Sequence, residues 1–328
     1  HEGRFYICFV ANDTRKTYLY TSEKIDGPWK KQLIEGFYHD GSLLFDEDGR
    51  NYIVYGNDEI WITELNEDLT APKKDGLHRL LVSDHKNPEL GYEGSHIQKI
   101  NGYYYIFLVH SLRDRWMRTE ACFYSDSLEG EFTGGDVLCD DRGYCGQGVA
   151  QGGIVDTPDG KWYAMLFQDS GAVGRIPILL PVTWKDHFPF FGQNGHVPEE
   201  IEVHSTRPGY IYQPLVGSDD FCNGLLPRWQ FNHDPDPRYY HLDALQGTYT
   251  ITTREVCTEL TQAVNTLTQR MSYPSCAAEV TVDASALKEG DVAGLCALQS
   301  CYAAVGITKH HGKYEVLMLD KKEDGILD

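Results

Sequence analysis

One short frame occurs three times along the chain. It consists of an acidic or amide residue, a glycine, an apolar run, a glycine turn and an aromatic strand. The copies begin at Asp40-Gly41-Ser42, Glu93-Gly94-Ser95 and Gln151-Gly152-Gly153, and their turns are Asp48-Gly49, Asn101-Gly102 and Asp159-Gly160. Asp-Gly and Asn-Gly between apolar runs predict tight β-hairpins. The copies start 53 and then 58 residues apart, a spacing typical of four-stranded propeller blades with variable loops.

A propeller places the first strand of each blade beside its central axis, so equivalent positions of successive blades converge there. Asp40, Glu93 and Gln151 hold equivalent positions in the three copies. We therefore expect these three side chains to face one another, although they lie far apart in sequence. Outer blade strands are expected at 121–125, 131–132, 176–179 and 182–184.

The frame ends before the last third of the chain. Residues 192–217 are rich in glycine and proline and indicate a closing segment and a linker. Beyond it, short alternating segments favour an antiparallel sandwich; they lie at 249–252, 278–282, 294–298, 303–307 and 314–318. Gly3 and the following aromatic residues match only the second half of the frame. We predict an all-β chain with a propeller at 1–213, incomplete at its N-terminal end, and a sandwich at 214–328, incomplete at its C-terminal end.

The net charge bears on the partners of the protein, and the cysteines bear on its compartment. The 49 acidic residues outnumber the 29 Lys and Arg and give a formal net charge of −20. The electrostatic field of this negative charge repels nucleic-acid backbones and anionic membranes, so we expect neither as a partner. The nine cysteines are odd in number and lack zinc-ribbon spacing, which favours a reducing compartment such as the cytoplasm. Because the chain has no initiator Met, the absence of a signal peptide does not decide the compartment. The oligomeric state stays open as well.

Several segments together resemble glycoside hydrolase family 43. They are YHDGSLLFDEDGRNYIVYG, YEGSHIQKINGYYYIF, GIVDTPDGKWYAMLF and GRIPILLPVTW in the first part of the chain, and SDDF, WQFNHDPDPRYY, NTLTQR and KEGDVAGLCALQ in the second. The resemblance implies a five-bladed propeller whose first blade is missing here and whose second is partial. It also implies that a concanavalin-like β-sandwich follows.

The family resemblance assigns roles to residues. Glu93 matches the general acid, and Asp40 matches the Asp that orients this acid and tunes its pKa, with Gly41 where the family usually has Pro. The general base has no counterpart in this chain and would lie in the missing blade, so we expect residues 1–328 alone to be inactive. Asp40 could instead cap a turn.

The resemblance also suggests substrate-binding residues. Arg175 matches an Arg that points at the sugar, although it could instead form a structural ion pair. We expect His39, His96 and Gln151 near the substrate too. No cofactor is required. Some family members hold a calcium ion at the propeller axis through a His, but Gln151 stands at that position, which argues against the ion.

The resulting hypothesis is an inverting glycosidase that acts on non-reducing-end xylosyl or arabinosyl residues of plant hemicellulose, a β-xylosidase. Its partner would be a xylo-oligosaccharide or an arabinosyl-substituted oligosaccharide. One alternative is an α-L-arabinofuranosidase of the same fold. The other is a carbohydrate-binding propeller without catalytic activity. Residues upstream of His1 would discriminate between an enzyme and a binding module.

Overall fold

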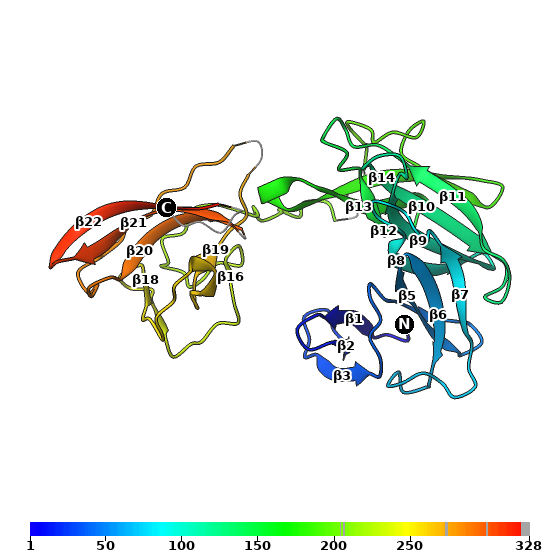
Figure 1. Cartoon of the computed structure of the whole chain (residues 1–328), viewed down its shortest axis with the longest axis horizontal. Coiled ribbons are helices and arrows are strands. Elements are labelled where there is room, and N and C mark those ends of the chain that lie inside the picture. The colour runs from blue at the N-terminus through cyan, green and yellow to red at the C-terminus, as the bar shows by residue number, and fades with distance from the viewer. Residues whose placement is uncertain (204, 206, 273–274, 300, 323–328) are drawn as a thin grey trace. The chain divides into compact units, whose positions relative to one another are not determined.

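The structure of the chain is a computed structural model that describes residues 1–203, 205, 207–272, 275–299 and 301–322 (Figure 1). The chain forms two compact units, 1–204 and 205–328. The described residues are almost entirely β-strand and loop, with two single-turn 3-10 helices, η1 (Gly171–Val173) and η2 (Leu260–Gln262). The predicted all-β fold class is confirmed. None of the helices in the described part of the chain has the length and apolarity that crossing a membrane requires.

The first unit consists of consecutive antiparallel sheets that resemble blades. Its strands are β1 (Phe5–Ala11), β2 (Lys16–Ser22), β3 (Lys30–Ile34), β4 (Ser42–Phe45), β5 (Asn51–Asn57), β6 (Glu59–Leu65), β7 (His78–Ser83), β8 (Glu93–Ile100), β9 (Tyr103–Ser111), β10 (Arg118–Ser125), β11 (Thr133–Leu138), β12 (Ala150–Asp156), β13 (Trp162–Asp169), β14 (Arg175–Lys185) and β15 (Phe188–Phe191). The sheets follow chain order as β1-β2-β3, β4 to β7, β8 to β11 and β12 to β15. Each is a meander, as the repeat predicts; the number of blades in the whole protein stays a prediction.

The hairpins between the first two strands of three sheets form where the glycine turns predict them. Gly49, Gly102 and Gly160 all have φ near +80°, at 81°, 85° and 78°. This left-handed conformation is accessible to glycine at no steric cost. The hairpins set the register in which Ile100 pairs with Tyr103.

Hydrogen bonds from side chains connect the first strands of neighbouring sheets. The Ser95 hydroxyl of β8 donates to the carbonyl oxygens of Asp40, at 2.9 Å, and of Val54, at 3.1 Å. The amide N–H of Ile97 donates to Ser42 Oγ of β4 at 3.2 Å. Because Ser95 is only 3% exposed, water does not compete for these bonds. The serines of the frame therefore join one blade to the next.

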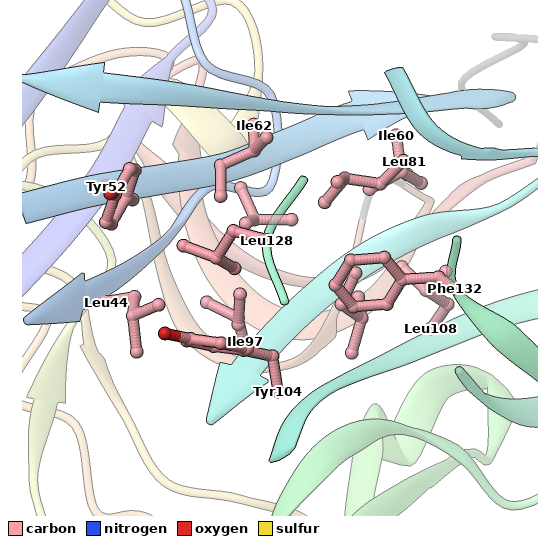
Figure 2. Close-up of a cluster of buried hydrophobic side chains, with 12 residues drawn as sticks. Leu44, Tyr52, Ile60, Ile62, Leu81, Ile97, Tyr104, Leu108, Leu128 and Phe132 are labelled. Carbon is pink, nitrogen blue, oxygen red and sulfur yellow. The ribbon is translucent and has the colours of Figure 1, made fainter. Parts of the chain in front are cut away.

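An apolar core fills the space between the second and third sheets. Buried side chains from both sheets meet there, among them Tyr52, Ile60, Ile62, Ile97 and Leu108 (Figure 2). Burying one such side chain completely stabilises the fold by about 1.5–3 kcal/mol. This core fixes β4 and β8 against each other, and both strands begin beside the candidate site.

Two outer strands of the first unit differ from the prediction. The outer strand expected at 131–132 is β11, which begins at Thr133. In this strand a Cβ atom at Gly134 would lie 2.0 Å from the carbonyl oxygen of Cys122. Only glycine allows β11 to approach β10 so closely. The segments 176–179 and 182–184 form one continuous strand, β14, in which Pro177 and Pro181 are both paired with β13.

The second unit contains smaller antiparallel sheets. Its strands are β16 (Gln230–Phe231), β17 (Tyr240–Asp243), β18 (Thr248–Ile251), β19 (Leu267–Thr268), β20 (Val292–Leu298), β21 (Tyr302–His310) and β22 (Lys313–Lys321). They pair as β16-β19, β17-β18 and β20-β21-β22. The strand predicted at 278–282 is wrong. Val280 and Val282 are 51% and 37% exposed, and no described strand pairs with that segment.

Candidate active site

The predicted site residues lie at the ends of strands. Glu93 and Arg175 are the first residues of β8 and β14, and Gln151 is the second residue of β12. His39 and Asp40 lie in the loop that leads into β4. The predicted site residues therefore come from three neighbouring sheets, those that contain β4, β8 and β12.

His39, Asp40 and Glu93 form one cluster. The ligand-capable atoms of the three side chains all lie within 4.8 Å of one another. His39 Nε2 is 3.8 Å from Asp40 Oδ2 and 3.7 Å from Glu93 Oε2. The side chains of Asp40 and Glu93 are 33% and 22% exposed, so the cluster is partly shielded from water.

The environment of Glu93 favours its protonated form. Burial raises the pKa of Glu93 above its ordinary value, and the negative charge of Asp40 raises it further. His39 and Arg118 lower that pKa and offset part of the rise. A carboxylic acid with a raised pKa keeps its proton closer to neutral pH and can donate it there.

Backbone geometry fixes the two carboxylates. Asp40 has a φ of 47°, in the left-handed region that non-glycine residues rarely adopt, and its carbonyl oxygen accepts the Ser95 hydroxyl. The register of β8 against β9 shifts between Glu93 and His96. Such a bulge changes the direction of the side chains next to it. The bulge and the Ser95 hydrogen bond therefore help to set the positions of the two acids.

A second group of charged residues lies on β10, β13 and β14. Arg118 is 4% exposed and donates from Nη1 to Asp169 Oδ2 at 3.0 Å. Arg175 Nε lies 3.3 Å from the other oxygen of Asp169. The two guanidinium carbons lie 4.6 and 4.4 Å from the ring centre of Phe167. Asp169 and Phe167 thus hold Arg175, whose side chain stays 63% exposed and available to a ligand.

Gln151 and His96 lie against the glycines of the frame. A Cβ built at Gly94 would be 2.6 Å from Gln151 Nε2, so the amide side chain occupies the space beside Gly94. A Cβ at Gly153 would be 3.4 Å from His96 Nδ1. The His96 side chain is accessible to solvent yet enclosed by protein on most sides. This enclosure lowers its pKa, against a smaller opposite effect of Asp40.

The surroundings of Gln151 do not suit a calcium ion. Arg118 Nη2 lies 3.5 Å from Gln151 Oε1, the oxygen that would have to coordinate the metal. A fixed positive charge at that distance repels a cation, and Ca²⁺ needs six to eight oxygen ligands. The His39, Asp40 and Glu93 cluster offers three groups that could coordinate a divalent ion. A carboxyl group binds metal only when it is deprotonated, and the surroundings of Glu93 favour its protonated form.

Several residues near the acids were not found from the sequence. Asn57, the last residue of β5, donates from Nδ2 to Glu93 Oε2 at 2.9 Å. Arg118, Asp169 and Glu120 also belong to the surrounding network. Arg118 and Glu120 lie outside the repeated frame, and Asn57 and Asp169 lie at the far ends of its aromatic strands, β5 and β13. The signal that could have identified them is their position at a strand end or, for Glu120, two residues from one.

Comparisons with known proteins agree with the geometry. The model for glycosyl hydrolases family 43 matches residues 1–189. A second model, described as beta xylosidase C-terminal Concanavalin A-like domain, matches residues 218–327. A putative beta-xylosidase of Xylanibacter ruminicola is 27% identical over 325 residues, which cover 94% of this chain and 59% of that protein. The chain therefore spans about three fifths of that relative's length.

Solved structures show the same fold. A bifunctional GH43-CE protein of Bacteroides eggerthii is 39% identical and has a TM-score of 0.85; the match covers 100% of this chain and 42% of that one. An engineered GH43 glycoside hydrolase with both endo-xylanase and exo-arabinofuranosidase activity is 26% identical, with a TM-score of 0.79. That match covers 98% of this chain and 64% of the other.

Proposed function

The chain belongs to glycosyl hydrolase family 43, and we propose on that basis that the protein releases xylosyl residues from the non-reducing ends of hemicellulose oligosaccharides by inversion. The observation that carries the proposal is the shielded pair of carboxylates, in which Asp40 raises the pKa of Glu93. This pairing supports Glu93 as the general acid. Asp40 would keep the acid protonated and orient it.

The proposed chemistry follows from the charge on each group. Protonated Glu93 donates its proton to the glycosidic oxygen as the bond from that oxygen to the anomeric carbon breaks, while a water molecule that gives its proton to the base attacks the same carbon from the opposite face. The leaving sugar departs as a neutral alcohol, and Glu93 becomes a carboxylate. The nearby His39 Nε2, 3.7 Å from Glu93 Oε2, and the charge of Arg118 then favour that carboxylate.

The separation of the two acids limits the role of Asp40. An inverting acid and base stand about 6.5–9.5 Å apart to leave room for water. Asp40 and Glu93 have oxygens within 4.8 Å of each other, which is too close for such a pair. In an inverting reaction the base would therefore be a third carboxylate. If Asp40 were instead a nucleophile, the reaction would retain the anomeric configuration, and NMR of the first product distinguishes the two outcomes.

Arg175 is the strongest candidate for binding the sugar. Its exposed guanidinium is fixed by Asp169 and lies over Phe167, so its planar set of donors is already oriented. His39, His96 and Gln151 would contribute further contacts near the acids. The substrate is an uncharged xylo-oligosaccharide or arabinosyl-substituted oligosaccharide, which the net charge of −20 does not repel.

Two alternatives are distinguished by one experiment. The engineered relative with exo-arabinofuranosidase activity favours an arabinofuranosidase as the second candidate. A carbohydrate-binding propeller without catalysis is the third. In the full-length protein, Glu93→Gln should nearly abolish hydrolysis of nitrophenyl β-D-xyloside or nitrophenyl α-L-arabinofuranoside, whichever the wild type cleaves. Retained activity would remove Glu93 from the acid role, and a wild type that cleaves neither but binds the sugars would favour the binding module.

A further inference from the structure

Glu120 is a buried carboxyl group that the proposed mechanism does not use. It lies in β10, is 0% exposed and forms no ion pair within the described residues. Its Oε2 accepts the backbone N–H of Gln151 at 2.6 Å, whereas Oε1 is buried with no hydrogen-bond partner in the described part of the chain. Burying a carboxyl oxygen without a hydrogen-bond partner costs free energy, so the presence of Glu120 at this position calls for an explanation.

The Glu120 hydrogen bond compensates for an irregularity in β12. The register of β12 against β13 shifts between Ala150 and Gly153, and Gln151 lies within this bulge with a φ of 69°. A bulged residue loses its place in the ladder, so its N–H needs another acceptor. Glu120 provides that acceptor and thereby holds Gln151 in its left-handed conformation.

The side chain of Gln151 contacts β8, the strand that begins at Glu93. Its side chain occupies the space directly beside Gly94, where a Cβ would lie 2.6 to 2.7 Å from three of its atoms. Gly94 follows Glu93 and has a φ of 65°, so the backbone of the acid turns at the contact with Gln151. A shift of Gln151 would therefore displace the acid.

We propose that Glu120 is a positioning residue for Glu93, which acts through the backbone of Gln151 and the contact of its side chain with Gly94. This inference rests on the proposed role of Glu93 as general acid. Burial raises the pKa of Glu120 well above its usual range, although the Gln151 hydrogen bond and Arg118 oppose this effect. This shift favours the neutral form of the carboxyl group. In the proposal Glu120 serves as a hydrogen-bond acceptor in a fixed position, and the amide oxygen of a glutamine can take that place.

Leaving-group dependence tests the proposal. A misplaced general acid slows substrates whose leaving oxygen needs a proton, but hardly affects those whose leaving group departs as a stable anion. The experiment compares an oligosaccharide with a 2,4-dinitrophenyl glycoside of the same sugar, in the full-length protein. We expect Glu120→Leu to lower kcat on the oligosaccharide about 100-fold, the scale of a 1 Å misplacement, and kcat on the dinitrophenyl glycoside less than about 3-fold.

Three further variants complete the design. Glu120→Gln keeps the acceptor and should retain both rates and the pH profile. Cys122→Ala, at another fully buried position of β10, is the matched control for a loosened strand and should leave the ratio of the two rates unchanged. If Glu120→Leu does not fold, Gln151→Gly removes the contact with Gly94 while keeping the backbone N–H, and should show the same substrate dependence.

The outcomes separate the two hypotheses. A wild type that cleaves neither substrate contradicts the proposed function itself. If the wild type is active but Glu120→Leu, or Gln151→Gly in its place, lowers both rates equally, Glu120 is only a structural residue. The positioning role is also contradicted if Glu120→Gln loses as much activity on the oligosaccharide as Glu120→Leu does.

Discussion

Asn57 and Glu93 are joined by a 2.9 Å hydrogen bond between two neighbouring sheets. The donor is the last residue of β5 and the acceptor is the first residue of β8. The candidate acid is therefore oriented by a strand, β5, that contains none of the site residues predicted from the sequence. Asn57 is itself exposed, so it acts through the direction of its N–H donor and not through burial of its side chain.

Replacing Asn57 with Ala should change the pH dependence of the reaction. An N–H donor stabilises the ionised form of a carboxyl group, so its removal raises the pKa of Glu93. Activity that requires the protonated acid is lost as pH rises through this pKa, and the basic limb should therefore move to higher pH. The measurement is kcat/KM against pH in the full-length protein. An unchanged basic limb would show that Asn57 does not act on the charge of Glu93.

Replacing Asp40 with Asn should have the opposite effect. The negative charge of Asp40 raises the pKa of Glu93, so its removal lowers that pKa and moves the basic limb to lower pH. We also expect the maximal rate to fall at least about tenfold, because the acid loses its orientation. Glu47→Gln, which removes an acid that is 84% exposed, is the control for net charge and should leave the profile in place. A basic limb that moves equally in both variants would contradict a local effect of Asp40.

Ser95 should matter for both stability and activity. Ser95→Ala leaves the carbonyl oxygens of Asp40 and Val54 without this donor, which should lower the free energy of unfolding by about 1–3 kcal/mol. Because Asp40 then loses a backbone constraint, kcat should fall as well. Ser125→Ala, at the last residue of β10, is the control: Ser125 is 6% exposed, and among the described residues its hydroxyl oxygen accepts a hydrogen bond only from the nearby Ser127 N–H. Denaturant unfolding and kcat measured on both variants check the prediction, and an equal kcat in the two would refute the link.

The repeat predicts the parts of the fold that depend on local chemistry. The Asp-Gly and Asn-Gly turns determine the hairpins, and the spacing of the frame brings Asp40 and Glu93 together. The outer strand β11 escaped prediction because its glycine pair weakens any strand signal, although the close approach to β10 requires glycine. The segment 278–282 has strand-like alternation but no partner among the described strands, and alternation alone supplies no hydrogen bonds.

The supporting residues of the site could not be predicted in the same way. Asn57 and Arg118 acquire their roles from sheet ends that meet only in the folded protein. Glu120 resembles any strand residue in sequence, and only its burial and its contact with a bulge distinguish it. Non-local packing decides these contacts, and periodicity contains no information about it.

The Ser95 hydrogen bonds have a consequence for how such a protein can be recombined. Ser95 belongs to the sheet of the candidate acid Glu93, but it fixes the backbone of Asp40 in the preceding sheet. The hydroxyl and the residue whose backbone it holds therefore come from one parent only when both sheets do. A chimera that replaces the blade of Ser95 keeps these hydrogen bonds only if the new blade has a hydroxyl group at this position, because the acceptors are backbone carbonyls. Exchanging the two adjacent blades together preserves this contact.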